Sequence, residues 1–398
     1  MKRYFLLGLA LPTAALAQLG LPSVGGVLQG VQQTVPRVAE LPVVNAARDL
    51  VRVRTDRLRD LVGRFPRDLE LDADGNPAVR GELLMTGARD SDLAAAQAAG
   101  FRIVERGAIE GADVGFARLA APSRLSLGAA VKRLRKLVPG AEVSANPLHF
   151  ETGAAGDGGG APAAGAGATA PVGLIDGGVS GRAGVSVAEQ RGFAAGAPTA
   201  SAHGTAVASL IGGAGRVRGA APGTSVLVAD IYGRDPAGGN ALALAKALGW
   251  MAARNVRVVT VSLVGPSNPL VAATINAVQR RGVAIVAAVG NDGPAAPPAY
   301  PASYPGVIAV TAVDGRDRAL IEAGRALHID FAAPGADMVA AAIDGAARPV
   351  RGTSFAAPLV AGRLARLGSL AALTAEARAI EPKKLYGRGL VCGDCRTR

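Results

Sequence analysis

The stretch RGTSFAAPLVAG, from Arg351 to Gly362, places two hydroxyl residues directly before an apolar run with helical spacing. Pro358 follows four residues after Ser354. Proline lacks a backbone N–H and is tolerated mainly near the first turn of a helix, so the stretch predicts a buried helix that begins close to Ser354. The N–H groups at such a start are unpaired. Thr353 or Ser354 is therefore either an N-cap or, in the case of Ser354, a nucleophile whose own N–H faces developing negative charge.

The length and the first residues of the chain set its broad class. The 398 residues leave room for two or three domains, and a hydrophobic content of 49% can fill a sizeable core. The beginning, MKRYFLLGLALPTAALAQ, has a basic start, a short apolar run and small residues around Ala17. This pattern predicts a signal peptide over residues 1–17, too short to span a bilayer. We expect a secreted or periplasmic protein without a transmembrane anchor.

The net charge of +12 is carried mostly by dispersed arginines, and the aromatic content is 4%. The one dense basic cluster, Lys132–Lys136, lies on an expected helix whose other face is apolar. We interpret it as a solvated helix face, and we expect no nucleic-acid partner.

The two cysteines, Cys392 and Cys395, lie in a short tail over residues 391–398. They have no strand–helix context that would indicate a redox or zinc site. In an exported chain they form either a small local disulfide or an intermolecular one.

The segment before the Gly/Ala-rich region divides into two parts. Residues 18–77 form a lead segment, in which Asn45–Phe65 has helical spacing but is charged and poorly capped, so we assign it no element. Residues 78–150 read as strand, helix, strand, strand, helix and strand. This order predicts a small ferredoxin-like α+β domain. Its expected elements lie at residues 79–87, 90–100, 101–106, 114–120, 126–140 and 141–148.

Residues 151–170 consist almost wholly of Gly, Ala and Pro, and we expect a linker there. From residue 171 to 390, short Val- and Ile-rich runs alternate with helical stretches near 202–211, 242–254, 270–281 and 354–367. Continuous apolar strands between helices predict an α/β fold with a parallel sheet covered on both faces. The chemistry of such sheets lies beyond the carboxyl ends of the strands.

Three polar residues lie at the ends of expected strands or at the start of an expected helix of this fold. Asp176 ends the run VGLID, His203 opens a helix in HGTAVAS, and Asn291 follows a buried strand in AAVGNDG. Taken singly, each has an ordinary interpretation as a turn or capping residue.

Together with Ser354, these segments resemble the subtilisin-like serine peptidases, which have Asp, His and Ser in this chain order. The boxes IDGG, HGTAVAS, SLVG, GND and GTSFAAP carry the resemblance, supported by GAAP at Gly219–Pro222 and LYGRGL at Leu385–Leu390. It implies a subtilisin-like fold and a serine endopeptidase that acts on protein or peptide substrates. Ser354 would be the nucleophile, His203 the general base and Asp176 its orienting carboxylate. Asn291 and the Ser354 N–H would form the oxyanion hole.

The resemblance also implies substrate-binding residues, namely Ser262, Leu263, Val264, Gly265 and Ala299. Four positions depart from the usual family pattern. Gly177 stands where Ser or Thr is common, and Ala206 stands where a second His is common. Val264 and Ala299 are both larger than the glycine often found at their positions, which suggests a narrowed pocket and a modest apolar residue before the scissile bond.

The unit over residues 78–150 resembles in topology the prodomains of this family. It is either an intramolecular inhibitor and folding aid, removed by self-cleavage between about Pro147 and Pro171, or a permanent accessory domain. We expect a monomer made as a precursor.

Two other functions compete with the peptidase. A degraded subtilisin-like binding protein would keep the fold without the chemistry, although the intact Asp176, His203, Asn291 and Ser354 argue against it. An esterase would need a G-x-S-x-G elbow, which is absent around Ser354, and a different order of the triad residues. We expect no cofactor and no metal. In particular, Gly212–Gly219 holds two arginines and no acid or amide, which makes a tight calcium site there unfavourable.

Overall fold

The computed structural model describes residues 43–153 and 170–397. The expected signal peptide and most of the expected linker lie outside these residues. Within them, no single helix combines the length and the apolar composition of a membrane span. Helices α9 (Thr353–Leu367) and α10 (Leu370–Glu376) pass such a test only as a pair, and they meet at a bend of 115°.

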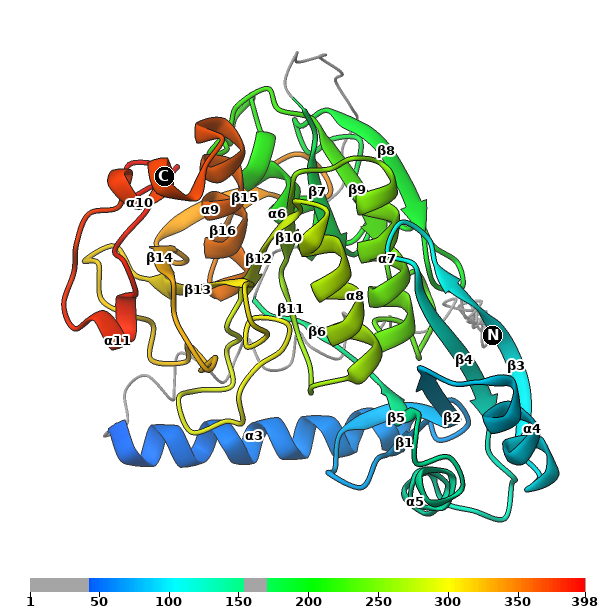
Figure 1. Cartoon of the computed structure of the whole chain (residues 1–398). Helices are drawn as coiled ribbons and strands as arrows, with labels where there is room; N and C mark the ends of the chain where they lie inside the picture. The colour runs from blue at the N-terminus through cyan, green and yellow to red at the C-terminus, as the bar shows by residue number, and fades with distance from the viewer. Residues whose placement is uncertain (1–42, 154–169, 398) are drawn as a thin grey trace, which may run out of the picture.

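A seven-stranded parallel sheet forms the centre of the molecule, in the order β14-β13-β12-β10-β7-β9-β8 (Figure 1). The register pairs Asp176 at the end of β7 with Asp230 at the end of β9, so two carboxylates lie at the carboxyl ends of neighbouring strands. The predicted α/β architecture is therefore confirmed. The strands are β7 Val172–Asp176, β8 Val187–Gly192, β9 Val226–Asp230, β10 Val258–Val261, β12 Ala284–Ala288, β13 Ile308–Val313 and β14 Phe331–Pro334.

Helices cover both faces of this sheet. Alternate strand residues point to opposite faces, so Leu174 packs in one apolar cluster with α6 (Ala202–Gly212) and α9. Ile175 packs in the other cluster with α7 (Ala241–Ala253) and α8 (Pro269–Arg280). Both faces of the strands are thus dry, which explains their continuous Val and Ile runs.

The N-terminal part forms a second, antiparallel sheet. Its strands lie in the order β1-β2-β4-β3, with β5 on the other side of β2. The order β5-β2-β4-β3 is the predicted ferredoxin-like arrangement. The elements are β1 Leu69–Leu71, β2 Pro77–Thr86, α4 Asp90–Ala98, β3 Arg102–Ile109, β4 Val114–Ala120, α5 Leu127–Leu137 and β5 Glu142–Pro147.

This sheet packs against α7 and α8 through apolar and polar contacts. Ile109 and Phe116 share an apolar cluster with Trp250. The side-chain oxygen of Asn146 accepts a hydrogen bond from Leu242 N at the start of α7 (3.1 Å). The backbones meet closely at Gly249, where a Cβ atom would lie 2.1 Å from the carbonyl oxygen of Glu110. The N-terminal sheet is therefore fitted to the helices and not merely tethered to them.

Several elements differ from the sequence expectation. The lead segment contains helix α3 (Val43–Arg64), in which we had assigned no element. Its inward face contacts parts of the chain far away in the sequence, which local periodicity cannot reveal. Strands β8 and β14 and the hairpin of β15 (Met338–Ala341) and β16 (Ala347–Val350) were not predicted either.

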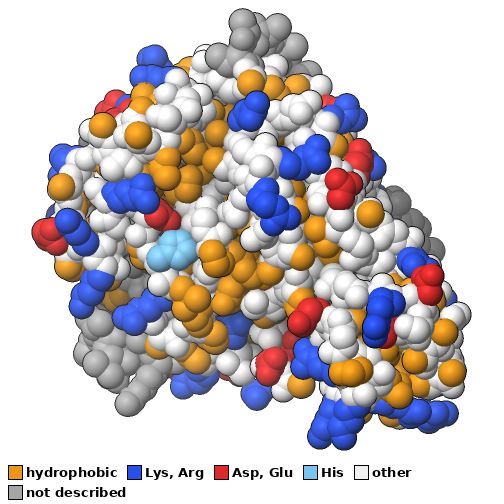
Figure 2. All heavy atoms as spheres, in the orientation of Figure 1, with side chains coloured by type: hydrophobic (Ala, Val, Ile, Leu, Met, Phe, Trp, Pro, Cys, Tyr) orange, Lys and Arg blue, Asp and Glu red, His pale blue; other side chains and the backbone are white. Residues whose placement is uncertain are grey.

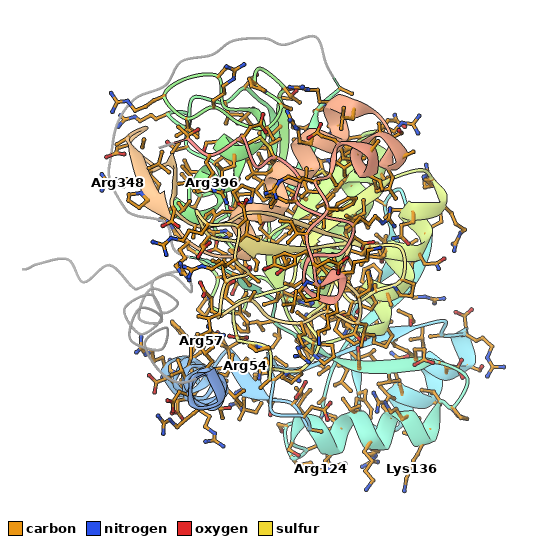
Figure 3. All side chains as sticks on the ribbon, turned by 90° about the vertical axis from the view of Figure 1, so that its left-hand side faces the viewer. Arg54, Arg57, Arg124, Lys136, Arg348 and Arg396 are labelled. Atoms are coloured by element: carbon orange, nitrogen blue, oxygen red, sulfur yellow. A yellow bond between two sulfur atoms is a disulfide. The ribbon has the colours of Figure 1, made fainter. Side chains whose placement is uncertain are left out.

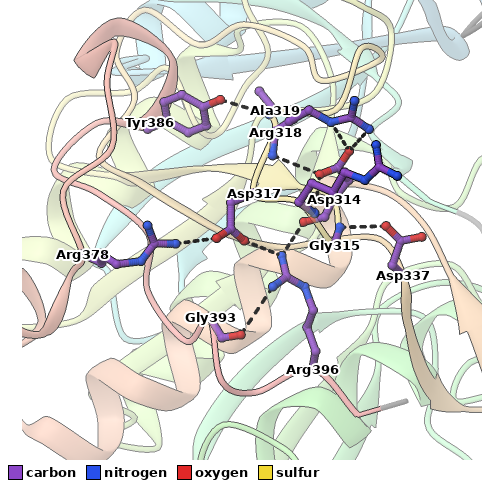
Figure 4. Close-up of polar contacts among 11 residues, drawn as sticks. Asp314, Gly315, Asp317, Arg318, Ala319, Asp337, Arg378, Tyr386, Gly393 and Arg396 are labelled. Carbon is purple, nitrogen blue, oxygen red and sulfur yellow. Dashed lines mark hydrogen bonds and ion pairs between the residues drawn. The ribbon is translucent and has the colours of Figure 1, made fainter.

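The C-terminal segment is fixed by polar contacts (Figure 4). Arg396 and Arg378 both bind the carboxylate of Asp317, and Ala319 N donates to the hydroxyl of Tyr386 in α11 (Lys383–Tyr386). Cys392 and Cys395 form a disulfide with each other, which is the local pairing of the two alternatives.

Lys and Arg side chains are spread over the face seen in Figure 2, among acidic and apolar ones. Of the expected basic cluster, Arg135 donates from Nε to the carbonyl oxygen of Val143, so one of its members supports β5.

Candidate active site

Asp176 and His203 form a buried hydrogen-bonded pair at the carboxyl end of the parallel sheet. His203 Nδ1 lies 2.9 Å from both carboxylate oxygens of Asp176, whose side chain is wholly buried. Gly177 N donates to Oδ1 (2.8 Å) and fixes the carboxylate. His203 stands in the first turn of α6, whose N-cap Ser201 accepts from Gly204 N. A carboxylate on Nδ1 leaves Nε2 as the ring atom that can exchange a proton.

The charge balance at this pair involves a third group, Glu151. Burial lowers the pKa of His203, but the charges of Asp176 and Glu151 and the hydrogen bond to Asp176, with a smaller effect of the nearby Thr152 carbonyl, outweigh it and raise the pKa to about 9. Burial raises the pKa of Glu151 to about 7, although His203 opposes this. One oxygen of Glu151, one of Asp176 and one nitrogen of His203 all lie within 4.8 Å of one another. The protonation of His203 therefore depends on the charge of Glu151, which lies close to both His203 and Asp176.

Ser354 lies in the first turn of α9, and the N-cap is Gly352. Of the two alternatives, the N-cap is wrong, because Thr353 and Ser354 both lie inside the helix and the cap position is taken by Gly352. Pro358, inside the helix, cannot donate to the carbonyl of Ser354 four residues earlier. Ser262 Oγ donates to this carbonyl instead (2.9 Å). The proline thus frees a buried backbone acceptor, and Ser262 satisfies it.

Asn291 holds the start of α9 from the loop after β12. Its side-chain oxygen accepts a hydrogen bond from Thr353 N (3.0 Å), while Gly290 N donates to the hydroxyl of Thr353 (3.0 Å). The oxygen of the Asn291 amide is therefore occupied, and its NH₂ group remains as a donor. Gly352 has φ 140°, and a Cβ there would lie 2.5 Å from Asn291 Nδ2 and 3.2 Å from the carbonyl oxygen of Thr152. Only glycine fits between them.

A segment of the chain itself occupies the site. Strand β6 (Phe150–Glu151) pairs antiparallel with β11 (Leu263–Val264). Before it, Tyr232 donates from its hydroxyl to the carbonyl of His149, and His149 N donates to the carbonyl of Gly239. The His149 side chain is wholly buried, and burial lowers its pKa to about 4, although the nearby backbone of Gly239 opposes this. We call Leu148–Gly153 the tail segment.

Thr152 of this segment lies against Ser354. Ser354 N donates to the carbonyl oxygen of Thr152 (3.2 Å), and the two hydroxyl oxygens are 2.5 Å apart. Thr152 N points to the carbonyl of Ser262 (3.4 Å). The carbonyl of Thr152 thus takes the position that a reacting carbonyl would take relative to Ser354.

The hydrogen bond expected between the Ser354 hydroxyl and His203 is not formed in this structure. His203 Nε2 is buried and has no hydrogen-bond partner among the described residues. The Ser354 hydroxyl is bonded to Thr152 and, weakly, to the carbonyl of Ser262 (3.4 Å). The physical reason is the tail segment, which offers the hydroxyl a closer partner.

The remaining predicted residues lie around this strand pair. Val264 pairs with Phe150 and packs over Gly290. Gly265 exchanges two backbone hydrogen bonds with Tyr300, next to the half-buried Ala299. Ala206, a residue of α6, is buried in the apolar cluster that α6 shares with α9 and one face of the sheet.

Sequence reasoning missed three residues of the site. Glu151 and Thr152 were expected at the start of the linker, whereas they lie in or next to β6; the pairing with β11 is non-local, and their own sequence carries no strand pattern. Asp230 was also missed, although it follows an apolar strand directly, as Asp176 does. Its carboxylate accepts from the N–H groups of Thr199, Tyr232 and Gly233, and burial raises its pKa against these bonds.

A buried Asp–His pair and a serine in the first turn of a helix, on a parallel sheet of this order, define the subtilisin-like class of serine proteases. A sequence model of the Subtilase family matches residues 185–381, which include His203, Asn291 and Ser354 and begin after Asp176. The chain is 30% identical over 193 residues to Subtilisin BL of Lederbergia lenta, covering 46% of this chain and 71% of that protein. The chain belongs to the subtilase family.

Two further comparisons extend this result. The major intracellular serine protease of Bacillus subtilis (strain 168) is 34% identical over 162 residues, which are 39% of this chain and 50% of that protein. The crystal structure of fervidolysin from Fervidobacterium pennivorans, described as a keratinolytic enzyme related to subtilisin, superposes with a TM-score of 0.64. It covers 83% of this chain and 62% of fervidolysin at 19% identity, so it supports the fold alone.

We predict that Ser262→Ala lowers the free energy of unfolding by about 1–3 kcal/mol, because it leaves the buried carbonyl of Ser354 without a donor. Thr260→Val is the matched control, since the buried hydroxyl of Thr260 has no partner among the described residues. Urea denaturation of both variants in a Ser354→Ala background, which prevents self-digestion, measures the difference. Equal midpoints for the two variants would contradict the assigned role of Ser262.

Proposed function

We propose that the protein is a serine endopeptidase, exported and made as a precursor. One observation carries the proposal: a carbonyl of an extended segment accepts a hydrogen bond from the N–H of Ser354, beside the Asp176–His203 pair. An extended peptide that pairs with β11 would lie in the same way.

The chemistry follows from the positions of the groups. Ser354 Oγ attacks the substrate carbonyl, and His203 Nε2 takes the hydroxyl proton. Asp176 keeps the proton on Nδ1 and stabilises the imidazolium. The oxyanion receives the Ser354 N–H and the NH₂ group of Asn291. His203 then gives its proton to the leaving amine, and a water molecule hydrolyses the ester by the same steps in reverse order.

The tail segment supports a precursor rather than a permanent accessory domain. It pairs with β11, places Thr152 against Ser354, and has buried side chains at His149 and Phe150. No substrate can pair with β11 while β6 is bound there. The N-terminal unit is therefore an intramolecular inhibitor until the chain is cut. The expected signal peptide, which lies outside the described residues, supports export to the periplasm or the medium.

We predict that Ser354→Ala abolishes hydrolysis of casein, with a loss on the order of 10⁶-fold, the size of the corresponding loss in subtilisin itself. Because the serine hydroxyl makes few contacts essential to folding, the thermal unfolding temperature should stay close to that of the parent. Ser91→Ala, which removes an exposed hydroxyl on α4, is the matched control and should keep full activity. Comparable turnover by the Ser354→Ala protein would overturn the assignment.

We also predict self-cleavage of the Thr152–Gly153 bond. The ester forms between Ser354 Oγ and the carbonyl carbon of Thr152, and the nitrogen of Gly153 leaves as an amine. Intact-mass measurement should give a wild-type fragment that begins at Gly153, while the Ser354→Ala protein lacks this cut. A first fragment that begins elsewhere in residues 147–171 would contradict the assigned bond, and an active chain that stays uncut would make the N-terminal unit a permanent domain.

The rate of this cleavage should depend on pH through His203, which acts as a base only when it is neutral. With a pKa of about 9, His203 becomes neutral as the pH rises, so the rate should rise across this range. Glu151→Gln removes a negative charge that raises the pKa of His203. The increase in cleavage rate should therefore occur at lower pH in this variant. Rate profiles from about pH 6 to about 10 test the shift against Glu142→Gln, an exposed control. Superimposable profiles would contradict the coupling.

A further inference from the structure

Helix α3 contacts the loop that carries Asn291. Arg57 binds Oδ1 of Asp292 (3.0 Å) and Arg54 binds Oδ2 (3.1 Å), so both carboxylate oxygens are used. The side chains are mostly buried, with exposed fractions of 15% for Arg57, 24% for Arg54 and 19% for Asp292. The next residue of the loop, Gly293, lies under the buried Leu50, and Ile321 completes this small apolar contact.

The residues of α3 that make these contacts lie on one face. Leu50, Arg54, Arg57 and Leu61 follow one another at intervals of four, three and four residues, which is the spacing of one helix stripe. Arg54 and Arg57 extend from α3 on the side of the molecule shown in Figure 3. Arg52 and Arg59, on the same helix, are exposed. The sequence therefore directs two arginines of this helix to Asp292 and leaves others in solvent.

The same stripe also reaches the tail segment. Leu58 and Leu61 share a buried apolar cluster with Leu148 and Phe150 of the tail segment and with Ala237 after β9. Helix α3 thus bridges two places on the catalytic unit, namely the Asp292 loop and the region of Ala237. Its contacts with the loop do not pass through the cleft and do not involve the Thr152–Gly153 bond.

We propose that the surface formed by Asp292, Gly293 and Ile321 is an exosite that binds a basic amphipathic helix, and that α3 is its occupant. Together with the packing of the N-terminal sheet on α7 and α8, it holds the N-terminal segment after the Thr152–Gly153 bond is cut. The exosite recognises one leucine and two arginines on one helix face, since two guanidinium groups can satisfy both oxygens of one carboxylate in a fixed geometry. The proposal rests on the proposed function only in supposing that cut.

A dissociation experiment tests the exosite without relying on peptidase activity. A recognition sequence for an unrelated protease, with its own flexible spacers, is inserted between Gly160 and Ala161 of the Ser354→Ala chain. The chain is immobilised through its C-terminus and cut, and the loss of the N-terminal fragment is followed by biolayer interferometry. Arg54→Ala/Arg57→Ala should make this fragment dissociate about tenfold faster. Added salt should accelerate its dissociation less than that of the parent, because the ion pairs Lys246–Glu105 and Arg191–Glu110 remain between the two parts while those to Asp292 are lost.

The control is Arg52→Ala/Arg59→Ala, which removes the same charge from the exposed side of α3 and should dissociate like the parent. Alanine favours helix, and the exposed ion pair of Arg52 with Asp49 that the control also removes is worth little, so neither pair should weaken α3 appreciably. Equal rates for the two pairs would overturn the proposal. Charge exchange provides a second test: Arg54→Glu/Arg57→Glu should dissociate fast, and adding Asp292→Arg should slow it again, whereas no recovery would contradict direct recognition of Asp292. If the wild-type chain never cuts itself, the proposed processing fails, while these rates still report on the exosite.

Discussion

The hydrogen bond from Ser354 N to the carbonyl oxygen of Thr152 is the contact around which the site is arranged. An N–H at a helix start is unpaired and points outward, so it needs an acceptor. Three features hold this N–H in position: Asn291 caps the helix at Thr353, Gly352 leaves space for the acceptor, and Ser262 satisfies the carbonyl that Pro358 releases. The acceptor comes from the chain itself, and the donor geometry that would stabilise an oxyanion thus also holds the inhibitory segment.

Electrostatics links this contact to the Asp–His pair. Glu151 immediately precedes Thr152, and pairing of β6 with β11 carries its carboxyl group to Asp176 and His203. A negative charge there favours protonated His203, which cannot accept the proton of Ser354. The bound segment therefore opposes catalysis in two ways, because it occupies the cleft and it raises the pKa of the general base. Removal of the segment would relieve both effects together.

The sequence predicted the parallel sheet, the ferredoxin-like unit and the positions of Asp176, His203 and Ser354, because these depend on local patterns. Apolar strands, helix starts and the residues directly after them are readable within a few positions. Contacts between distant segments were not readable. Strand β6 exists only through β11, and the inward face of α3 is defined by Asp292, which lies 235 residues after Arg57. The Gly/Ala-rich composition that follows Gly153 also masked the roles of Glu151 and Thr152, which lie in or next to β6.

The occupation of the site by the tail segment is measured most directly by the rate at which a fluorophosphonate probe labels Ser354. The labelling rate is compared between two samples. In the first, the N-terminal segment is present, either covalently joined or still bound after cleavage. In the second, the catalytic unit has been separated from that segment. Because Thr152 is bonded to the Ser354 hydroxyl and N–H, we expect slow labelling with the segment present and fast labelling once it is removed. Adding back the separated segment should slow the reaction again. Equal labelling rates in the two states would contradict the occupation of Ser354 by the tail segment.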